Sequence, residues 1–165
     1  MSETPLYTAL RHHHALHRAP FHTPGHKCAA GALPPDLLQL DYTELPDTDS
    51  LFEASGPILQ AEQAAAALFG ARRTLFSAGG CSLCIQTMLR LSCPQGGTVL
   101  CARNAHRTAV NAMALLGLTP LWVMPKNILN ILNKNTDRID ACYVTNPDYY
   151  GRLLDISALA AACRR

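Results

Sequence analysis

The chain has 165 residues, of which 48% are hydrophobic and 16% are charged, and its formal net charge is +2. This size suits one globular domain with a buried core, and the near-neutral charge without a basic, aromatic-interleaved stripe argues against a nucleic-acid partner. No apolar run reaches membrane-spanning length and the N-terminus MSETPLYTALRHHH has no signal-peptide core, so we expect neither a membrane nor a secretory role.

Residues 1–55 are rich in histidine and proline, and we expect them to form an N-terminal arm. A short helix is predicted over Leu6–His17, because Pro20, Pro24 and Gly25 follow and end it. The rest of the arm, including LPPDLLQLDYTELPDTDSL, is expected to be irregular with short turns. Such an arm has little core of its own, so it should lie on the body of the protein or on a partner subunit.

Residues 56–125 alternate between helical and strand patterns. In chain order we predict a helix at ILQAEQAAAALFG closed by Gly70, a strand at about Arg73–Ser77, a helix at about Ser82–Leu91, a strand at TVLCA, a helix at NAHRTAVNAMALLG closed by Gly117, and a strand at LTPLWVM. Glycine suits the end of a helix because it adopts left-handed backbone angles at little cost.

Residues 126–165 repeat this scheme more weakly. NILNILNK is a short helix of poor formers, RIDACYVTN is a strand, and DISALAAAC is a helix for which Asp155 is the predicted N-cap. Strands that alternate with helices predict an α/β fold, here a partial three-layer sandwich with a mostly parallel sheet of about four strands and flanking helices.

Ligands of parallel sheets bind beyond the carboxyl ends of the strands, where residues 79–82, 103–106 and 146–151 are expected to share one rim. In LFSAGGCSLCIQTML the glycines allow several N–H groups to face one side, and the following helix adds free N–H groups and its positive dipole end. Gly80, Cys81 and Ser82 therefore form a candidate site for a phosphate monoester, although neither GxGxxG nor the P-loop is matched. A tight turn without a ligand explains this stretch equally well.

Cys81 and Cys84 form a C-S-L-C pair at the start of a predicted helix, a spacing that also occurs in thiol oxidoreductases. Cys84 falls on an apolar helix face, where a free cysteine is often simply buried, and no second CxxC completes a metal site. The total of seven cysteines is odd, which argues against a secreted disulfide framework and favours a reducing cytoplasm.

Two further turns on the predicted rim carry side chains that can face a ligand. His106 lies at a strand exit or in the first helical turn, where the alternative is a capping or solvated histidine. In TNPDYYG, Asn146 and Asp148 can bond the local backbone, and Tyr149 and Tyr150 can offer hydroxyl groups or ring faces. The alternative is a turn with tyrosines packed on its surface.

Six histidines lie in the arm: His12, His13, His14, His17, His22 and His26. On a helix His13 and His17 share a face, as in a metal-binding pair. No carboxylate has a fitting spacing, so a solvated helix is the favoured interpretation.

Five segments match motifs in a fixed order: FHTPGHK, DYTELPDTDSLFEASGPILQAEQAAAALFGA, FSAGGCSLCIQTML, RNAHRTAVNAM and TNPDYYG. Together they resemble the bacterial Orn/Lys/Arg decarboxylase family of pyridoxal-phosphate enzymes, whose large domain is of the aspartate-aminotransferase type. The resemblance implies an arm over residues 1–55 and the N-terminal half of a cofactor-binding large domain over residues 56–165.

The resemblance also implies roles at matching positions. Gly80, Cys81 and Ser82 would cradle the phosphate of pyridoxal 5'-phosphate, His106 would stack on its ring, and Thr145 would contact it from the TNPDYYG segment. Cys81 stands where the family has a hydroxyl residue, which weakens one donor and keeps the backbone N–H. The substrate would be a small basic amino acid (arginine, lysine or ornithine), and the family's sites form between subunits, so we expect a homo-oligomer or association with a homologous chain.

The family's Schiff-base lysine, in a Ser-x-His-Lys segment, and its pyridine-binding acid have no counterpart here. The three lysines are Lys27, within the N-terminal motif, and Lys126 and Lys134, beside a weak helix and expected to be solvated. We therefore expect this chain to be a truncated, split or partial decarboxylase that has no catalytic residue of its own and is not competent alone. The alternatives are a non-catalytic fragment that acts by assembly with a homologue, and a CxxC thiol oxidoreductase.

Overall fold

A computed structural model describes residues 4–29, 31, 33–134 and 139–164. These residues form two compact units, Met1–Phe76 and Ser77–Arg165, which are described separately below. The expected boundary between an arm and a large domain after residue 55 stays a prediction. No helix in the described ranges combines the length and the apolar character needed to cross a lipid bilayer.

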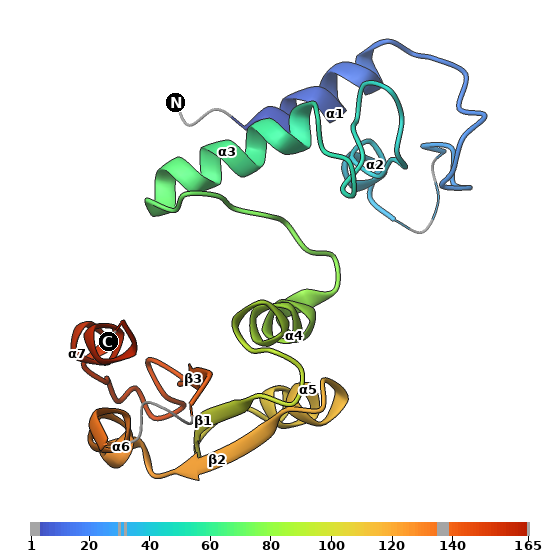
Figure 1. Cartoon of the computed structure of the whole chain (residues 1–165). Helices are drawn as coiled ribbons and strands as arrows, with labels where there is room; N and C mark the ends of the chain where they lie inside the picture. Colours follow the sequence, from blue (N-terminus) through green and yellow to red (C-terminus); the bar gives the residue numbers. More distant parts are fainter. Residues whose placement is uncertain (1–3, 30, 32, 135–138, 165) are drawn as a thin grey trace. The chain divides into compact units, whose positions relative to one another are not determined.

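The first unit is built on two helices that pack against each other, α1 (Pro5–Ala15) and α3 (Pro57–Phe69), with a short α2 (Pro35–Leu38) between them in the chain (Figure 1). The predicted helix over residues 6–17 is confirmed, although it ends at Ala15. Proline is tolerated at the start of each helix because the first helical turn needs no N–H donor. Gly70 ends α3 in the left-handed region, with a φ of 62°, as its position predicted.

The expectation of solvated arm histidines without a carboxylate partner was wrong for His13. This side chain is buried, and its Nδ1 lies 2.8 Å from Oδ2 of Asp47. The partner lies 34 residues further along the chain, so helical spacing gave no sign of it. The disfavoured alternative, a metal pair of His13 and His17, gains no support, since the described residues contain no group of three or more His, Cys, Asp or Glu that could hold a metal ion.

The Asp49 side chain forms hydrogen bonds with the backbone that leads into α3. Its carboxylate accepts backbone N–H groups from Ser50, Ser55, Gly56 and Ile58, at 2.8 to 3.0 Å. Desolvation raises the pKa of Asp49, but these four donors outweigh it and lower the pKa from 3.8 to about 2. The carboxylate thereby satisfies N–H groups at the start of α3 that have no partner within the helix.

Replacing this carboxylate is expected to destabilise the first unit. Asp49→Asn tolerates the positive φ of 73° but turns one acceptor oxygen into a donor amide, so we expect the thermal midpoint to fall by several degrees at neutral pH. The contribution of the carboxylate to stability is complete above about pH 3.8 and is lost as the pH falls through about 2. The thermal midpoints of the variant and of the native chain should therefore become equal near pH 2. Circular dichroism at several pH values measures this, and the exposed Glu53→Gln should change little.

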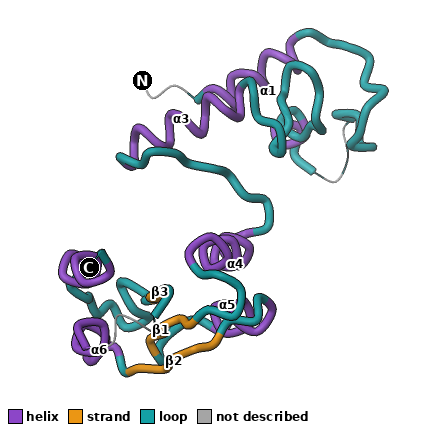
Figure 2. Tube along the Cα trace, in the orientation of Figure 1, coloured by secondary structure: helices purple, strands orange, loops and turns teal. Residues whose placement is uncertain are grey.

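The second unit contains a three-stranded parallel sheet in the order β2-β1-β3, with β1 (Thr98–Ala102) in the centre (Figure 2). The flanking strands are β2 (Thr119–Val123) and β3 (Ala141–Tyr143). The unit's helices are α4 (Gly80–Ser92), α5 (Arg107–Leu115), the 3-10 turn η1 (Pro125–Asn127), α6 (Ile128–Lys134) and α7 (Ile156–Cys163). The α/β class predicted from the sequence is thus confirmed.

The side chains of β1 alternate between two apolar cores. Val99 and Cys101 pack with residues of α4 and α5, whereas Leu100 and Ala102 pack with residues of α6 and α7. All four are fully buried, as expected for a central strand of a parallel sheet covered on both faces. The sheet is therefore the middle layer of three.

The predicted sheet of about four strands was too large by one strand. The segment over residues 73–77 is not a strand: it pairs with none of the strands that the structure describes. The N–H of Phe76 instead donates to the buried Glu62 carboxylate at 2.8 Å. An apolar run predicts extended backbone, but a strand also needs a neighbour, which the local pattern does not supply.

Candidate functional site

The candidate site lies where the strands of the second unit end and where α4 begins. Residues 103–106 follow β1, and residues 145–151 follow β3. The strands are parallel, so both turns leave the same edge of the sheet. Side-chain contacts between the turns decide which of the predicted site residues lie together.

The glycine turn forms the start of α4. Gly80 has a φ of +67°, which favours glycine, and a side chain added there would meet nothing within 4 Å. At Gly79, by contrast, a Cβ would lie 2.5 Å from the Leu83 side chain. Gly79 is therefore required by packing, whereas the space beside Gly80 is open. The first-turn N–H groups of a helix such as α4 have no intrahelical partner and attract anions.

Thr108 connects the glycine turn to His106. The Ser82 and Thr108 hydroxyl oxygens are 3.3 Å apart, and the Thr108 hydroxyl lies 3.0 Å from Nδ1 of His106. The same Nδ1 accepts the Thr108 N–H at 3.2 Å, so His106 is the N-cap of α5. Because Nδ1 accepts, the proton of the neutral ring is on Nε2. Sequence reasoning missed Thr108, since a threonine two residues after a histidine has no distinctive pattern.

The third turn is held by two polar side chains, as the sequence predicted. Asp148 accepts the N–H groups of Tyr150 and Arg152, both at 2.9 Å, and Asn146 accepts the N–H of Leu154 at 2.8 Å. The Arg152 N–H is the largest cause that lowers the pKa of Asp148 below its ordinary value. Asn104, after β1, donates to Asp148 at 3.5 Å and joins this turn to the second one.

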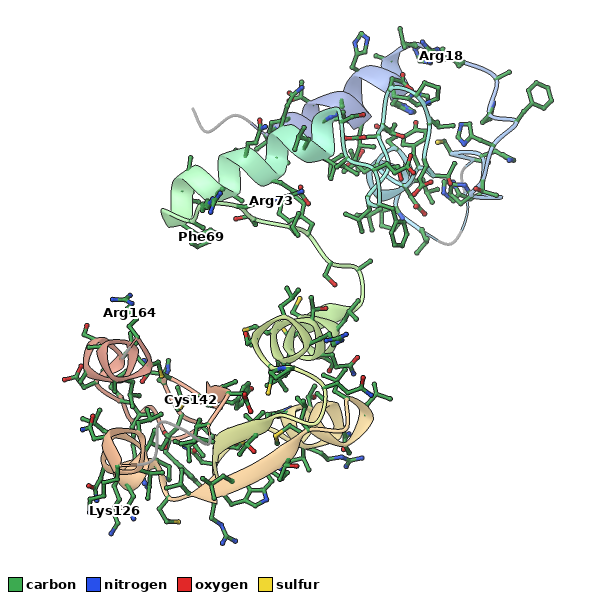
Figure 3. The ribbon with its side chains drawn as sticks, in the orientation of Figure 1. Arg18, Phe69, Arg73, Lys126, Cys142 and Arg164 are labelled. Carbon is green, nitrogen blue, oxygen red and sulfur yellow. The ribbon has the colours of Figure 1, made fainter. Side chains whose placement is uncertain are left out.

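A cavity of about 660 Å³ opens between the segments that follow the three strands. Its polar lining residues are Arg103, Asn104, Lys126, Thr145, Asp148, Tyr149, Tyr150 and Arg152. The lining therefore holds three cations (Arg103, Lys126 and Arg152) and one carboxylate, that of Asp148. Because Asp148 already accepts backbone N–H groups, the lining suits an anionic ligand group. Lys126, labelled in Figure 3, is exposed as expected, but sequence reasoning did not place it at a cavity.

Thr145 lies in this cavity lining, and its buried hydroxyl oxygen makes no hydrogen bond of ordinary length among the described residues, although it lies near enough to the Tyr143 phenol to oppose the rise that burial gives the pKa of that group. A buried polar group without a partner is costly, and such an atom points to an absent ligand or water. The predicted residues Gly80, Cys81, Ser82 and His106 do not line the cavity. They form a separate cluster, joined through Thr108.

Cys81 and Cys84 are both free and exposed on α4. Cys84 was interpreted as a cysteine buried on an apolar helix face, and the expected burial was wrong, because the residue is exposed. Within the described ranges these two thiols belong to no group of ligands that could hold a metal ion. Nothing else in their surroundings distinguishes them as a redox pair.

Comparison with known proteins gives a consistent result. The family model described as "Orn/Lys/Arg decarboxylase, major domain" matches residues 4–162. The arginine decarboxylase of Bacillus subtilis (strain 168) is 33% identical over 95% of this chain, and the inducible lysine decarboxylase of Escherichia coli (strain K12) is 30% identical over 78% of it. The chain spans 36% and 20% of the length of these two relatives.

A solved structure, that of the E. coli constitutive lysine decarboxylase, superimposes on 89% of the chain with a TM-score of 0.67. The sequence identity is 22%, and the match covers 25% of that protein. This likeness supports the fold.

Proposed function

The chain belongs to the Orn/Lys/Arg decarboxylase family, and on this premise we propose that its second unit provides the phosphate-binding part of a pyridoxal 5'-phosphate site. The reaction of the whole enzyme would be decarboxylation of a basic amino acid, as the names of the relatives suggest. When bound, the cofactor supplies an electron sink, and the protein supplies position and electrostatics. The observation that carries the proposal is the open glycine turn joined through Thr108 to His106.

The turn suits a phosphoryl group for three reasons. The space beside Gly80 is open, the N–H groups of the first turn of α4 are available, and the Ser82 hydroxyl is exposed. Cys81, in the place of a hydroxyl residue, still offers its backbone N–H, while its thiol is a weak donor. The turn would therefore bind phosphate mainly through the backbone and Ser82.

His106 would contribute its ring. Its Nδ1 is held by Thr108, so the ring orientation is set by the start of α5 and not by the ligand. A ring held in this way can stack on a flat heteroaromatic ligand without losing further rotamer freedom. Thr145, with its unpartnered hydroxyl, would donate to a polar group of the same ligand from the neighbouring cavity.

We propose that the cofactor is held here without a covalent bond to lysine, so that these residues alone do not decarboxylate an amino acid. Lys27 lies in the first unit, where it donates to the backbone oxygen of His22, and Lys134 is the last residue of α6. Lys126 follows β2, which lies on the other side of β1 from β3, and it lines the cavity. None of them belongs to the cluster of Ser82, Thr108 and His106.

The ring of His106 is the best point for a test. His106→Asn keeps an N-cap acceptor for α5 but removes the ring, so we expect the dissociation constant for pyridoxal phosphate to rise about fivefold. Binding can be followed by quenching of the only tryptophan, Trp122 on β2. His12→Asn, on the exposed side of α1, is the matched control and should bind like the native chain.

Two results would contradict the proposal. Equal affinity of the native chain and His106→Asn would remove His106 from the site. A stoichiometric adduct at one of the three lysines after borohydride reduction, located by mass spectrometry, would show that the cofactor is covalently held.

A further inference from the structure

The arm histidines take no part in the proposed function, yet four of the six, His13, His14, His17 and His22, line one cavity of the first unit. This cavity has a volume of about 210 Å³ and is lined by six basic side chains: His13, His14, His17, Arg18, His22 and Lys27. No carboxylate belongs to the lining among the described residues. Arg18 is labelled in Figure 3.

The rings lie close together. The centroids of His13 and His22 are 5.9 Å apart, those of His13 and Tyr42 are 4.6 Å apart, and those of His14 and His17 are 6.1 Å apart. Pro20, Cys28 and Tyr42 complete the lining. Desolvation and the hydrogen bond with Cys28 raise the pKa of Tyr42 to about 12, so the phenol is neutral in the physiological range.

The hydrogen bonds show which ring nitrogens are available to a ligand. Nδ1 of His13 faces the Asp47 carboxylate and Nδ1 of His22 faces the Thr23 carbonyl at 2.6 Å, so both Nδ1 atoms are donors. Nε2 is then the ring nitrogen that these bonds leave to a ligand, and in an imidazolium ring both nitrogens are donors. Nδ1 of His14 lies 3.1 Å from the Tyr42 hydroxyl, and either group can be the donor, so Nε2 of His14 is the ring nitrogen that this hydrogen bond does not use.

Asp47 is the carboxylate that contacts side chains of this lining among the described residues, while Asp41 contacts His26, which lies outside the lining. Asp47 lies behind His13 and also accepts a hydrogen bond from Arg18 at 3.1 Å. Desolvation raises its pKa, but the His13 hydrogen bond and the Arg18 charge contribute to a net lowering. Asp47 therefore stays ionised and pairs with both His13 and Arg18, whereas His14, His17, His22 and Lys27 have no carboxylate partner among the described residues.

The backbone around the cavity is strained. His17, Lys27 and Cys28 have φ values of 50°, 54° and 56°, which are uncommon for residues other than glycine. Such conformations persist where the surrounding structure holds them, and they are concentrated at ligand sites.

From this cluster we propose that the histidine-lined cavity binds a small phosphate-type oxyanion, and that binding strengthens as the pH falls and the histidines become charged. Protonated Nε2 atoms of His13, His14 and His22 would donate to the oxygens, and Arg18, Lys27 and His17 would add charge at the rim. The neutral Tyr42 phenol and the Cys28 side chain lie in the same lining. The volume suits a single oxyanion group with a short substituent.

The test uses sulfate, whose charge is constant over the range in which histidine titrates. Histidine ring signals of the full chain are followed by NMR during sulfate titrations at about pH 5.5 and about pH 8. We expect saturable shifts of the His14 and His22 rings, with affinity on the order of tenfold higher at the lower pH. His22→Gln and Lys27→Gln should each weaken binding, and His12→Gln, which lies on the same unit outside the cavity, should not.

Several outcomes would overturn the proposal. One is a response that chloride reproduces at equal ionic strength, which would indicate non-specific screening. Another is an equal loss of affinity in His12→Gln, and a third is no change of affinity with pH. Acetate should bind more weakly than sulfate, and equal affinity would exclude a preference for a divalent oxyanion.

Sulfate could also bind at the glycine turn of the second unit, and the ring signals separate the two events. Binding at the turn would shift the His106 ring and leave His14 and His22 unchanged. Shifts confined to His106 would therefore contradict the second site, and they would leave the proposed cofactor site intact.

Discussion

Leu100→Ala is expected to lower the free energy of unfolding of the second unit by about 3 kcal/mol, the largest stability effect that we predict. Leu100 lies in the middle of β1, is fully buried, and belongs to the core formed with α6 and α7. The change removes apolar contacts on one face of the central strand and leaves a cavity, because the paired backbone of β1 cannot collapse into the gap.

Urea denaturation of the native chain and of the variant measures this difference. Leu91→Ala is the matched control: Leu91 is 82% exposed on α4, so its loss should change the free energy of unfolding by no more than about 0.5 kcal/mol. Equal losses in the two variants would mean that the sheet with its two covered faces is not the core of this unit.

Gly80→Ala is expected to raise the dissociation constant for pyridoxal phosphate by about tenfold, the largest effect on binding that we predict. The φ of +67° is costly for alanine, and relaxation of that strain would turn the first N–H groups of α4 away from a bound phosphoryl group. The added methyl group would also enter the open space beside the turn.

The variant Gly96→Ala is the control that distinguishes a loss of stability caused by backbone strain from a direct loss of binding. Gly96 has a similar φ of +76° and open space around it, but it lies in the turn before β1. Both variants should lose a similar amount of stability, and only Gly80→Ala should lose affinity when quenching of Trp122 is measured. A similar loss of affinity in both variants would show that the effect comes from general destabilisation.

Much of the local structure could be predicted from the sequence. Gly70 and Gly117, with φ values of 62° and 64°, follow the helices that they were expected to close. Asp155 accepts the Ala158 N–H at 2.9 Å as the N-cap of α7. These features depend on contacts between residues a few positions apart, which a sequence pattern contains directly.

Strand pairing could not be predicted in the same way. The strand pattern of TVLCA became the centre of the sheet, while the similar pattern of residues 73–77 stayed unpaired. Both stretches favour extended backbone, and the difference lies in whether a neighbour is present. Association with a second copy or a homologous chain, expected from the family resemblance, stays a prediction.

The candidate site, too, could be predicted from the sequence only in part. The glycine turn and His106 were predicted from local pattern and from resemblance, whereas their connection through Thr108 depends on how α4 and α5 pack. The cavity lined by Lys126 and Thr145 depends on the order of three strands. The pair of His13 and Asp47 joins residues 34 positions apart.

The sequence by itself determined the α/β class, the family, the helix ends and the glycine turn, because each follows from residue types within a few positions or from motifs in order. Only the tertiary structure decided which strands pair, that Thr108 links Ser82 to His106, that His13 is buried against Asp47, and that His13, His14, His17 and His22 line one cavity. The physical reason is that packing brings distant residues together through burial and shape, and neither property is encoded in the spacing along the chain.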